Sequence, residues 1–532
     1  MPDAGWPGSE SVRAAEVIAA LSLATDLGIG VPLEHGLHST LIAMRLADQL
    51  AVDSTTASQT YYACLLFYVG CTANADVAAE IFGADNSLTA YAAPARFGSQ
   101  PEMIAGFVRA IAPPDGALLV RARQLARGLP RVGLVFKQHI TAFCEVAGML
   151  TDRLGLPGPI AALFAHVAER WDGKGRPGLA EQDEIPLPVR IVHVARDAAL
   201  QRMLGGDEFA VRVIRERAGH AFDPAIAALV ADDADILALD PAGSAWDETL
   251  AVEPRPRLTL AGEAIDRAMA AMGDFADLVS PYLVGHSSGV ADLAATAAAR
   301  LHLGPADVVS IRHAALVHDL GRVAVPARIW QKRGDLTADE WERVRLHPYY
   351  TERVLTRSPF LSALAPVASS HHERLDGSGY HRRLRMPTLD PPARLLAVTD
   401  AYHAMTEPRP HRRALPRTEA ARTLTDAGRA GLFDIDAVVA VLDAAGQKVP
   451  RIVRPAGLTE REAEVIGLLA RGLQTKHIAR ALGISAKTAD RHVQNVYGKI
   501  GVSTRAAAAL FAMEHGLVAW GELPIAASRS RL

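Results

Sequence analysis

Apolar residues that recur every three or four positions limit the possible folds of this chain more than any other feature. The pattern runs through Val290–Leu301, Ile311–His318 and Ala393–Met405, and this spacing is typical of amphipathic helices. Alternation at every second position, which marks a half-buried strand, persists nowhere. Only 5% of the residues are aromatic, whereas Ala and Leu, which favour helices, are abundant. The sequence therefore predicts an all-α protein.

Two proline-containing stretches interrupt this helical patterning. They are Ala251–Leu258 (AVEPRPRL) and Lys448–Gly457 (KVPRIVRPAG), and clustered prolines mark loops or linkers. A chain of 532 residues has room for roughly three or four domains. We therefore expect three units, over residues 10–250, 255–448 and 455–520.

The first two predicted units resemble each other. The first contains ERWDGKGRPGL followed by EIPLPVRIVHVARD, and the second contains ERLDGSGY followed by TLDPPARLLAVTD. Each also begins with a histidine on a helix rich in Ala and Leu, in LEHGLHSTLIAMRLAD and VGHSSGVADLAATAAARL. The shared order of these strings favours an ancient duplication over chance similarity between two helical domains.

The second unit carries histidine and aspartate residues inside apolar helices. Single histidines such as His302 and His313 are usually core or surface residues. Adjacent pairs are harder to explain in that way: in LVHDLG, His318 and Asp319 follow the apolar run Ala314–Val317. Burial of an unpaired carboxylate is costly, and coordination to a metal relieves that cost. His and Asp side chains also ligate divalent metals at neutral pH.

From about Asp274 to Arg413 the sequence resembles the HD-GYP family of the HD phosphohydrolase superfamily. The matching residues are His286 in GHSSGVADLA, the pair His318 and Asp319, His347 in RLHPYYTERVL, His371 and His372 in SSHHERLDGSGY, and Asp400 in LLAVTDAYHAMTEPRPHR. The resemblance implies a helical domain of at least five helices. It also implies that these seven residues bind two divalent ions, iron or manganese, which Asp319 bridges.

The resemblance further implies a phosphodiesterase that acts on a cyclic dinucleotide, with cyclic di-GMP as the expected substrate. Two metal ions about 3.5–4 Å apart share a water, lower its pKa and so provide a nucleophile for phosphorus. Asp319 and Arg322 are the expected catalytic residues. Arg322 in HDLGR and Arg409 and Arg412 in RPHR are expected to bind the substrate phosphates. An exposed basic loop is the alternative interpretation of the last two.

Three departures from the family pattern weaken the prediction of cyclic di-GMP specificity. The family usually has lysine in place of Arg322, and arginine clamps phosphate but does not readily donate its proton. His381 replaces the proline of the GYP tripeptide, so that the loop loses a fixed φ angle. His411 replaces a common tyrosine. A third metal would need a carboxylate one turn before His286, where Tyr282 stands, so we expect a two-metal site.

Two alternatives to this enzyme stay open. In the first, the protein is a transcription regulator whose HD domain binds metal and nucleotide as a sensor without turnover. In the second, it hydrolyses a different phosphoester. The complete set of metal ligands favours hydrolysis, whereas the departures at Arg322 and His381 favour the sensor.

The first unit is expected to be a degenerate copy. Its counterparts of the family motifs are His38 for the first ligand, Phe67 and Tyr68 for the His-Asp pair, Val167, Ala168 and Glu169 for the HHE motif, and Arg196 or Asp197 for the last aspartate. Aromatic rings cannot replace a His-Asp pair at a bridged metal site. We therefore predict no dinuclear site in this unit, and a regulatory, packing or dimerisation role.

The segment Leu458–Leu517 resembles the LuxR-type helix-turn-helix. Thr459 and Glu462 form a predicted capping box at the start of its first helix. The first of four expected helices ends at about Ala470. The other three span Thr475–Leu482, Ala486–Ile500 and Arg505–His515. The third should be the recognition helix, with Val493, Val496 and Ile500 on its apolar face.

This segment is also basic. From Arg451 to Leu532 there are 12 Lys and Arg against 6 Asp and Glu, a net +6, so the remainder of the chain carries −9. A basic domain suits DNA as a partner, although a helical protein-interaction module is the alternative. The expected DNA-binding residues are Lys487, Thr488, Arg491, His492, Asn495, Lys499 and Arg505. Because such modules commonly read paired half-sites, we also expect a homodimer.

The remaining features suggest a cytoplasmic protein. The three cysteines have no metal-knuckle spacing and favour a reducing compartment. The sequence MPDAGWPGSE at the N-terminus lacks the basic and apolar regions of a signal peptide. No apolar run approaches the roughly 18 residues that a membrane span needs, so we expect no membrane partner.

Overall fold

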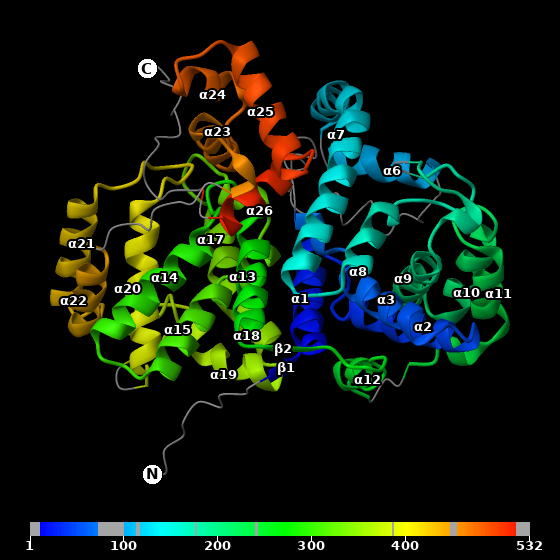
Figure 1. Ribbon diagram of the computed structural model, residues 1–532, viewed down its shortest axis with the longest axis horizontal. Coiled ribbons are helices and arrows are strands. Elements are labelled where there is room, and N and C mark those ends of the chain that lie inside the picture. Colours follow the sequence, from blue (N-terminus) through cyan, green and yellow to red (C-terminus); the bar gives the residue numbers. More distant parts are fainter. Residues whose placement is uncertain are drawn as a thin grey trace. The chain divides into compact units, whose positions relative to one another are not determined.

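The computed structural model describes residues 11–72, 100–112, 117–175, 178–239, 243–385, 388–446, 455–515 and 517. The chain forms two compact units, one over Ser11–Ile265 and one from Asp266 onward. Nearly all regular structure in both units is helical (Figure 1), which confirms the predicted all-α fold. Within these residues no helix combines the length and apolar character that a membrane crossing requires.

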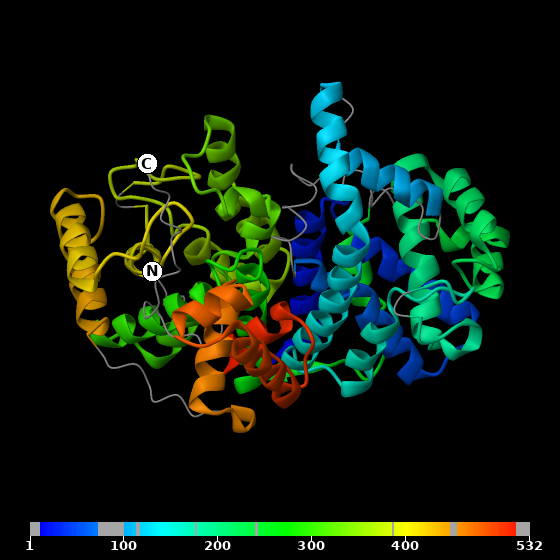
Figure 2. The ribbon, with the colours of Figure 1, turned by 90° about the horizontal axis from the view of Figure 1, so that it is seen from above.

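The first unit is a helical domain with a very small sheet. Its helices are α1 (Ala14–Ile29), α2 (His35–Gln49), α3 (Ser54–Leu65), α6 (Gln100–Ile111), α7 (Leu118–Arg153), α8 (Gly158–Leu163), α9 (Leu187–Gly205), α10 (Asp207–Arg217), α11 (Pro224–Asp232) and α12 (Ala245–Ala251). Helix α2 packs against α9 and α3, and α7 extends past the other helices of this unit (Figure 2).

The small sheet was not predicted. Strand β1 (Ser11–Arg13) pairs antiparallel with β2 (Thr259–Ala261), and Val12 lies opposite Leu260. Three residues are too few for an alternating pattern to stand out from the sequence. The pairing draws the segment after the prolines into the first compact unit, which therefore extends to Ile265 rather than to the predicted boundary at residue 250.

The second unit contains a larger helical domain. Its helices are α13 (Glu263–Asp277), α14 (His286–Arg300), α15 (Pro305–Val317), α16 (Ala327–Trp330), α17 (Ala338–Arg345), α18 (His347–Leu355), α19 (Pro359–Ala368), α20 (Pro391–Thr406), α21 (Arg417–Arg429) and α22 (Ile435–Ala444). Helix α14 packs against α15, α20 and α22. Buried alanines of α14, such as Ala294 and Ala297, let these helices approach closely.

The two units begin their central helix in the same way. Helix α2 starts at His35 after Glu34, which has a left-handed φ of 72°. Helix α14 starts at His286 after Gly285, which has a φ of 78°. His35 is therefore the counterpart of His286, and the prediction that His38 takes this place is wrong. Both histidines lie in the same helical turn, so residue spacing alone did not distinguish them.

Hydrogen bonds that support these helix starts are also repeated. Asp26 accepts a hydrogen bond from the amide of Gly36 at 3.2 Å, and Asp277 accepts one from the amide of Ser287 at 2.9 Å. All four residues are the counterparts that the alignment of His35 with His286 requires. The repeat supports the predicted duplication.

A second repeated hydrogen bond lies in the loop that follows the HHE motif. Glu373 accepts from the amide of Arg382 at 2.8 Å, and Glu169 in the first unit accepts from the amide of Gly178 at 2.9 Å. Each carboxylate holds the loop that follows it by accepting from a backbone amide of that loop. The two units therefore share a framework of buried acidic residues that bind backbone amides.

Candidate metal centre

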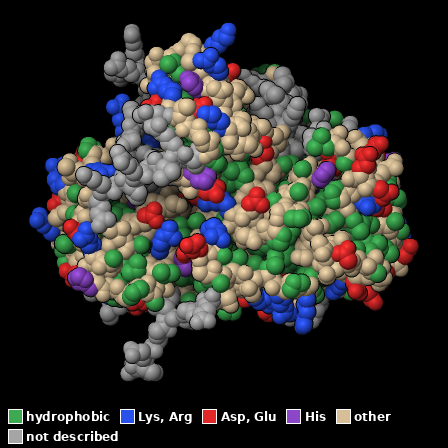
Figure 3. All heavy atoms as spheres, viewed as in Figure 1, with side chains coloured by type: hydrophobic (Ala, Val, Ile, Leu, Met, Phe, Trp, Pro, Cys, Tyr) green, Lys and Arg blue, Asp and Glu red, His purple; other side chains and the backbone are tan. Residues whose placement is uncertain are grey.

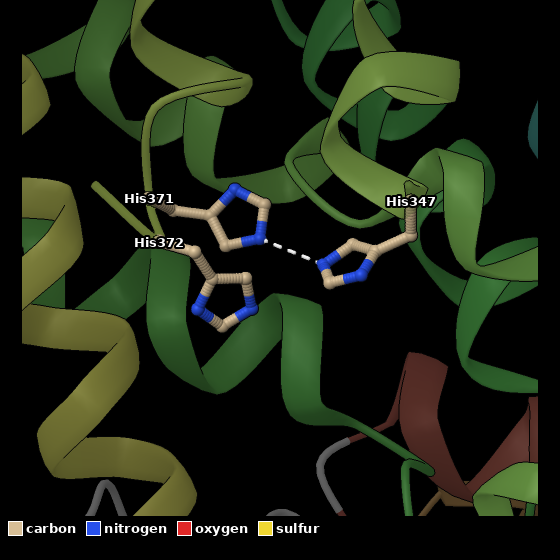
Figure 4. Close-up of side chains that lie close together, drawn as sticks. All are labelled: His347, His371 and His372. Atoms are coloured by element: carbon tan, nitrogen blue, oxygen red, sulfur yellow. Dashed lines mark hydrogen bonds between the residues drawn. The ribbon is translucent and has the colours of Figure 1, made fainter. Parts of the chain in front are cut away.

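The seven predicted ligands converge in the second unit as two groups that meet at one carboxylate. His286, His318, Asp319 and Asp400 place ligand atoms within 4.8 Å of one another, and His347, His371 and His372 form a second such group. Figure 4 shows this second group, in which the three imidazole rings face a common space.

Asp319 lies between the two groups. Its Oδ2 atom is 2.8 Å from His318 Nε2 and 3.3 Å from His286 Nε2. Its Oδ1 atom is 3.2 Å from His347 Nε2 and 3.3 Å from His371 Nε2. One oxygen therefore faces each group, which is the arrangement that a carboxylate bridge between two metal ions requires.

Helix ends position most of these side chains. His286 and His347 are the first residues of α14 and α18, and His318 is the C-cap of α15. His371 follows α19, and Asp400 lies inside α20. These positions bring the imidazoles and the Asp400 carboxylate together in the two ligand groups.

Backbone carbonyls orient three of the histidines. The Nδ1 atoms of His318, His347 and His371 lie 2.7, 2.6 and 2.6 Å from the carbonyl oxygens three residues earlier. Since a carbonyl only accepts, each Nδ1 carries a proton, which leaves Nε2, the atom that faces Asp319, as the ring nitrogen available to bind a metal. A metal-binding histidine needs this tautomer.

Burial makes the centre suited to a cation. Asp319 Oδ1, Asp400 Oδ1 and His318 Nε2 are buried and, within the described part of the chain, form no hydrogen bond. Burial lowers the pKa of His371 to about 4, so its ring is neutral at neutral pH. Buried acceptors without partners are costly, and a bound divalent metal would satisfy all of them. These residues therefore fit a metal ion.

Arg322, the predicted phosphate-binding residue, lies beside this centre. Its Nη2 atom is 2.6 Å from Asp319 Oδ2 and 3.4 Å from His286 Nε2. The guanidinium lies 5.4 Å from the centroid of the Trp330 ring, and the Trp330 indole donates to the Arg322 carbonyl at 3.2 Å. This aromatic support holds a buried cation next to the ligands.

Arg409 and Arg412 have different surroundings. Arg409 Nη2 is 2.7 Å from Glu407 Oε2, and its Nη1 donates to the Tyr282 carbonyl at 2.7 Å. Arg412 donates to backbone carbonyls at the end of α20, including that of Glu407 at 3.1 Å. Both guanidinium groups are thus hydrogen-bonded within the domain, and their role in phosphate binding stays a prediction.

Two residues near His286 were missed from the sequence. His403 and Glu407 form a third group with His286 in which ligand atoms lie within 4.8 Å. Both residues belong to DAYHAMTEPRPHR, whose other residues drew attention to the basic positions only. Glu407 is the C-cap of α20, so a polar residue there has an ordinary structural explanation from sequence alone.

The loop after the HHE motif folds tightly back on it. A Cβ atom at Gly379 would lie 2.5 Å from the Glu373 Cα atom and from the His372 carbonyl oxygen, so glycine is required. The ring of Tyr380 then lies 4.7 Å from that of His372, at an angle of 31°. The loop therefore covers one side of the second histidine group.

His381, which replaces the family's proline, takes part in an ion-pair group. Its Nε2 atom lies 3.4 Å from Glu352 Oε2, and Arg382 also pairs with Glu352. These contacts connect the loop to α18. They restrain the loop at the position where the missing proline predicted a loss of rigidity.

In the first unit an arginine occupies the corresponding region. The Arg196 guanidinium lies 4.6 Å from the Phe67 ring centroid and 5.6 Å from that of Tyr68. His35 Nε2 is 3.1 Å from the Arg196 carbonyl oxygen. Aromatic rings and an organic cation thus stand where the second unit has metal ligands. Among the described residues, groups of three or more such ligand atoms within 4.8 Å of one another lie in the second unit.

The C-terminal helices match their predicted bounds closely. They are α23 (Glu460–Ala470), α24 (Thr475–Ala481), α25 (Ala486–Ile500) and α26 (Arg505–Glu514). Thr459 and Glu462 form the expected capping box, and Ser485 caps α25 by accepting from the Thr488 amide at 3.1 Å. Helix α25 packs on α23 and α24, as a recognition helix in a helix-turn-helix does.

The predicted DNA-binding residues divide into two sets. Lys487, Arg491 and Asn495 are exposed on α25, with Thr488 and His492 half-buried beside them. Figure 3 shows Lys and Arg side chains on the surface over the C-terminal helices. By contrast, Lys499 pairs with Glu462 at 2.6 Å and Arg505 donates to the Gly472 carbonyl at 3.0 Å.

Two known protein families match this chain, one in the two helical units and one in the C-terminal helices. The family described as "HD domain" matches residues 136–226 and 270–436, and therefore parts of both units. The family described as "Bacterial regulatory proteins, luxR family" matches residues 456–512. Parts of both units are therefore similar to HD domains, and the C-terminal helices are similar to the DNA-binding domain of LuxR-family regulators.

The chain is also similar to several named phosphodiesterases. The chain is 28% identical to the 3′3′-cGAMP-specific phosphodiesterase 3 of Vibrio cholerae over 75% of this chain and 88% of that protein. It is 36% identical to a cyclic di-GMP phosphodiesterase of Thermotoga maritima over 26% of this chain and 38% of that protein. The crystal structure of a cyclic GMP-AMP-specific phosphodiesterase of V. cholerae has the same fold, with a TM-score of 0.56 at 24% identity, over 82% of this chain and 99% of that one. By their names, these relatives are phosphodiesterases of cyclic dinucleotides.

Proposed function

We propose that the second unit is a metal-dependent phosphodiesterase that opens a cyclic dinucleotide, and that the LuxR-family domain binds specific DNA as part of a transcription regulator. The position of Asp319 carries the enzymatic part of this proposal, because each of its oxygens faces a separate group of ligands. The relatives act on cyclic di-GMP or 3′3′-cGAMP according to their names, so we propose a substrate of this class.

Two divalent ions, iron or manganese, would supply an activated water and offset negative charge on the phosphoryl group. His286, His318 and Asp400 would hold one ion, His347, His371 and His372 the other, and Asp319 both. Neutral imidazoles leave the ions electrophilic. The protein therefore contributes a rigid set of lone pairs in a buried site.

Arg322 is the residue that we propose to bind the phosphate. It is the cation nearest Asp319 in the described part of the domain, and a guanidinium binds two phosphate oxygens at once. Tyr380, which lies against the ring of His372, covers the ligands on another side. Together these residues would bind and orient the scissile phosphate.

A sensor that binds metal and nucleotide without turnover is the second candidate. Arg322 supports this candidate, because arginine does not donate its proton to a leaving group. In either case we propose that α25 enters the major groove as part of a homodimer. A cytoplasmic location, where nucleotides and DNA are both accessible, completes the proposal.

The test is a product assay joined to a metal count. The full chain is purified with Mn²⁺ or Fe²⁺ and incubated with cyclic di-GMP, with 3′3′-cGAMP and with a linear phosphodiester. We expect two metals per chain, linear product from a cyclic dinucleotide, and loss of both in Asp319→Ala. Asp292→Ala, at an exposed ion pair of the same domain, is the matched control. Two metals without product would favour the sensor, and product only from the linear compound would favour a different phosphoesterase.

A further inference from the structure

One histidine of the metal centre is held differently from the others. The Nδ1 atom of His286 lies 2.9 Å from Glu407 Oε2, a carboxylate contributed by a segment far along the chain. His318, His347 and His371 instead use the carbonyl of their own preceding turn. We propose that Glu407 is a positioning residue that fixes His286 as a metal ligand, and that Arg409 acts through Glu407. The proposal rests on the metal centre of the proposed function but not on turnover.

The geometry defines the tautomer of His286. Since the Glu407 carboxylate accepts a hydrogen bond from Nδ1, the other ring nitrogen is the one available to bind a metal. That nitrogen, Nε2, lies 3.3 Å from Asp319 Oδ2 and 3.2 Å from Asp400 Oδ1, and it therefore faces the centre. A carboxylate behind a metal-bound histidine fixes the orientation of the ring and raises its basicity.

The charge of the carboxylate distinguishes this contact from the three carbonyl contacts. Hydrogen bonds to an ionised acceptor are roughly twice as strong as neutral ones. Glu407 is only 2% exposed, and the Arg409 guanidinium, 2.7 Å from Oε2, places a positive charge directly beside its carboxylate.

Two arginines hold Glu407 in place. Arg409 Nη2 lies 2.7 Å from the same oxygen that faces His286, and its Nη1 is fixed on the Tyr282 carbonyl. Arg412 donates to the Glu407 carbonyl and to the Ala404 carbonyl one turn earlier. The end of α20 is thereby fastened next to the start of α14, which places carboxylate and imidazole within hydrogen-bond distance.

A metal bound by His286, His403 and Glu407 themselves is a weaker explanation of the same cluster. Glu407 Oε2 already has a cation at 2.7 Å in Arg409. A metal there would have to displace that guanidinium and also remove the Nδ1 proton of His286. The distance of 2.9 Å between Nδ1 and Oε2 is that of a hydrogen bond. The positioning role needs no such rearrangement.

The experiment measures Mn²⁺ affinity of the full chain, without substrate, by competition with a chelator. Glu407→Ala leaves Nδ1 without its acceptor, so we expect about 10- to 100-fold weaker binding at one of the two sites. Glu407→Gln keeps a neutral acceptor and should lose less than alanine does. Glu342→Ala, at an exposed glutamate of the same domain, should leave affinity unchanged. Co²⁺ in place of Mn²⁺ adds an absorption spectrum that should change in Glu407→Ala.

Wild-type Mn²⁺ affinity and an unaltered Co²⁺ spectrum in both Glu407 variants would overturn the proposal. A third Mn²⁺ in the wild type that both variants lose would do the same, in favour of the separate metal site. Arg409→Ala should weaken Mn²⁺ binding and add little to Glu407→Ala, because the two act in series. A raised KM with unchanged metal affinity would instead make Arg409 a substrate ligand. Because no arm except that KM depends on hydrolysis, an inactive protein would refute the phosphodiesterase and leave this test intact.

Discussion

We expect replacement of Arg322 to weaken phosphate binding and to leave metal binding unchanged. This side chain is 5% exposed and its Nη2 lies 2.6 Å from Asp319, yet a guanidinium donates hydrogen bonds and does not ligate a cation. A hydrogen bond between charged groups contributes about 1.5–3 kcal/mol. Since about 1.4 kcal/mol corresponds to a factor of ten, Arg322→Ala should lower kcat/KM about 10- to 150-fold while the protein keeps both metals.

Arg322→Lys should have a different signature. Lysine keeps the charge but loses the planar fork, so phosphate binding weakens by about one hydrogen bond, or 0.5–1.5 kcal/mol. An ammonium can also donate its proton to the departing oxygen, which arginine cannot. We therefore expect KM to rise about 2- to 10-fold and kcat to rise as well.

The assay is steady-state hydrolysis of the cyclic dinucleotide that the wild type cleaves, with metal content measured on the same samples. Arg312→Ala, a partly exposed arginine of α15 that pairs with Asp292, is the control and should behave as wild type. Unchanged kcat/KM in Arg322→Ala, with two metals bound, would refute the assignment. Loss of metals in that variant would mean that Arg322 supports the ligands rather than the substrate.

Three further expectations follow from the same structure. Gly321→Ala should lower both the urea midpoint and the metal content, because its Cβ would lie 2.1 Å from a carbonyl oxygen of α18, whereas Gly334→Ala meets no atom within 4 Å and should have little effect. Burial lowers the pKa of His35 to about 4, so between pH 6.5 and about 4 the unfolded chain binds a proton that the folded chain does not. Over that range the free energy of unfolding should fall by about 3 kcal/mol. His35→Gln, unlike exposed His220→Gln, should therefore reduce the fall of the urea midpoint between pH 7.5 and 5. Arg491→Ala should weaken binding about 5- to 150-fold to a duplex selected from random DNA by the wild type, without a change in hydrolysis; equal affinity would contradict the assignment of α25.

Local signals were sufficient to predict the C-terminal module. Helix α25 has the predicted bounds, Ala486–Ile500, because residues next to it specify both ends. Ser485 accepts from a first-turn amide, and Gly501 takes a left-handed φ of 73° at the C-cap. By contrast, the β1–β2 pair joins segments from opposite ends of the first unit, and nothing local in either segment indicates its partner.

The metal centre was predictable to the extent that motifs carry it. His371 and His372 follow each other in the chain, and their motif indicates them directly. Glu407 has no such signal, because its relation to His286 arises only when the end of α20 meets the start of α14. The choice between His35 and His38 also needed the structure, since only the position of the helix start shows which one is the counterpart of His286.

Comparison of the two units indicates which parts of the domain the metal ions support. The first unit keeps the buried hydrogen bonds of Asp26 and Glu169 to loop and helix amides, but has aromatic rings and Arg196 in place of ligands. Because this framework persists in the first unit without the ligand set, we expect the fold of the second unit not to depend on metal coordination. Asp319→Ala in the second unit should accordingly fold, with near wild-type helical circular dichroism, while it loses metal and activity. An unfolded Asp319→Ala protein would show that coordination, rather than the shared framework, stabilises this domain.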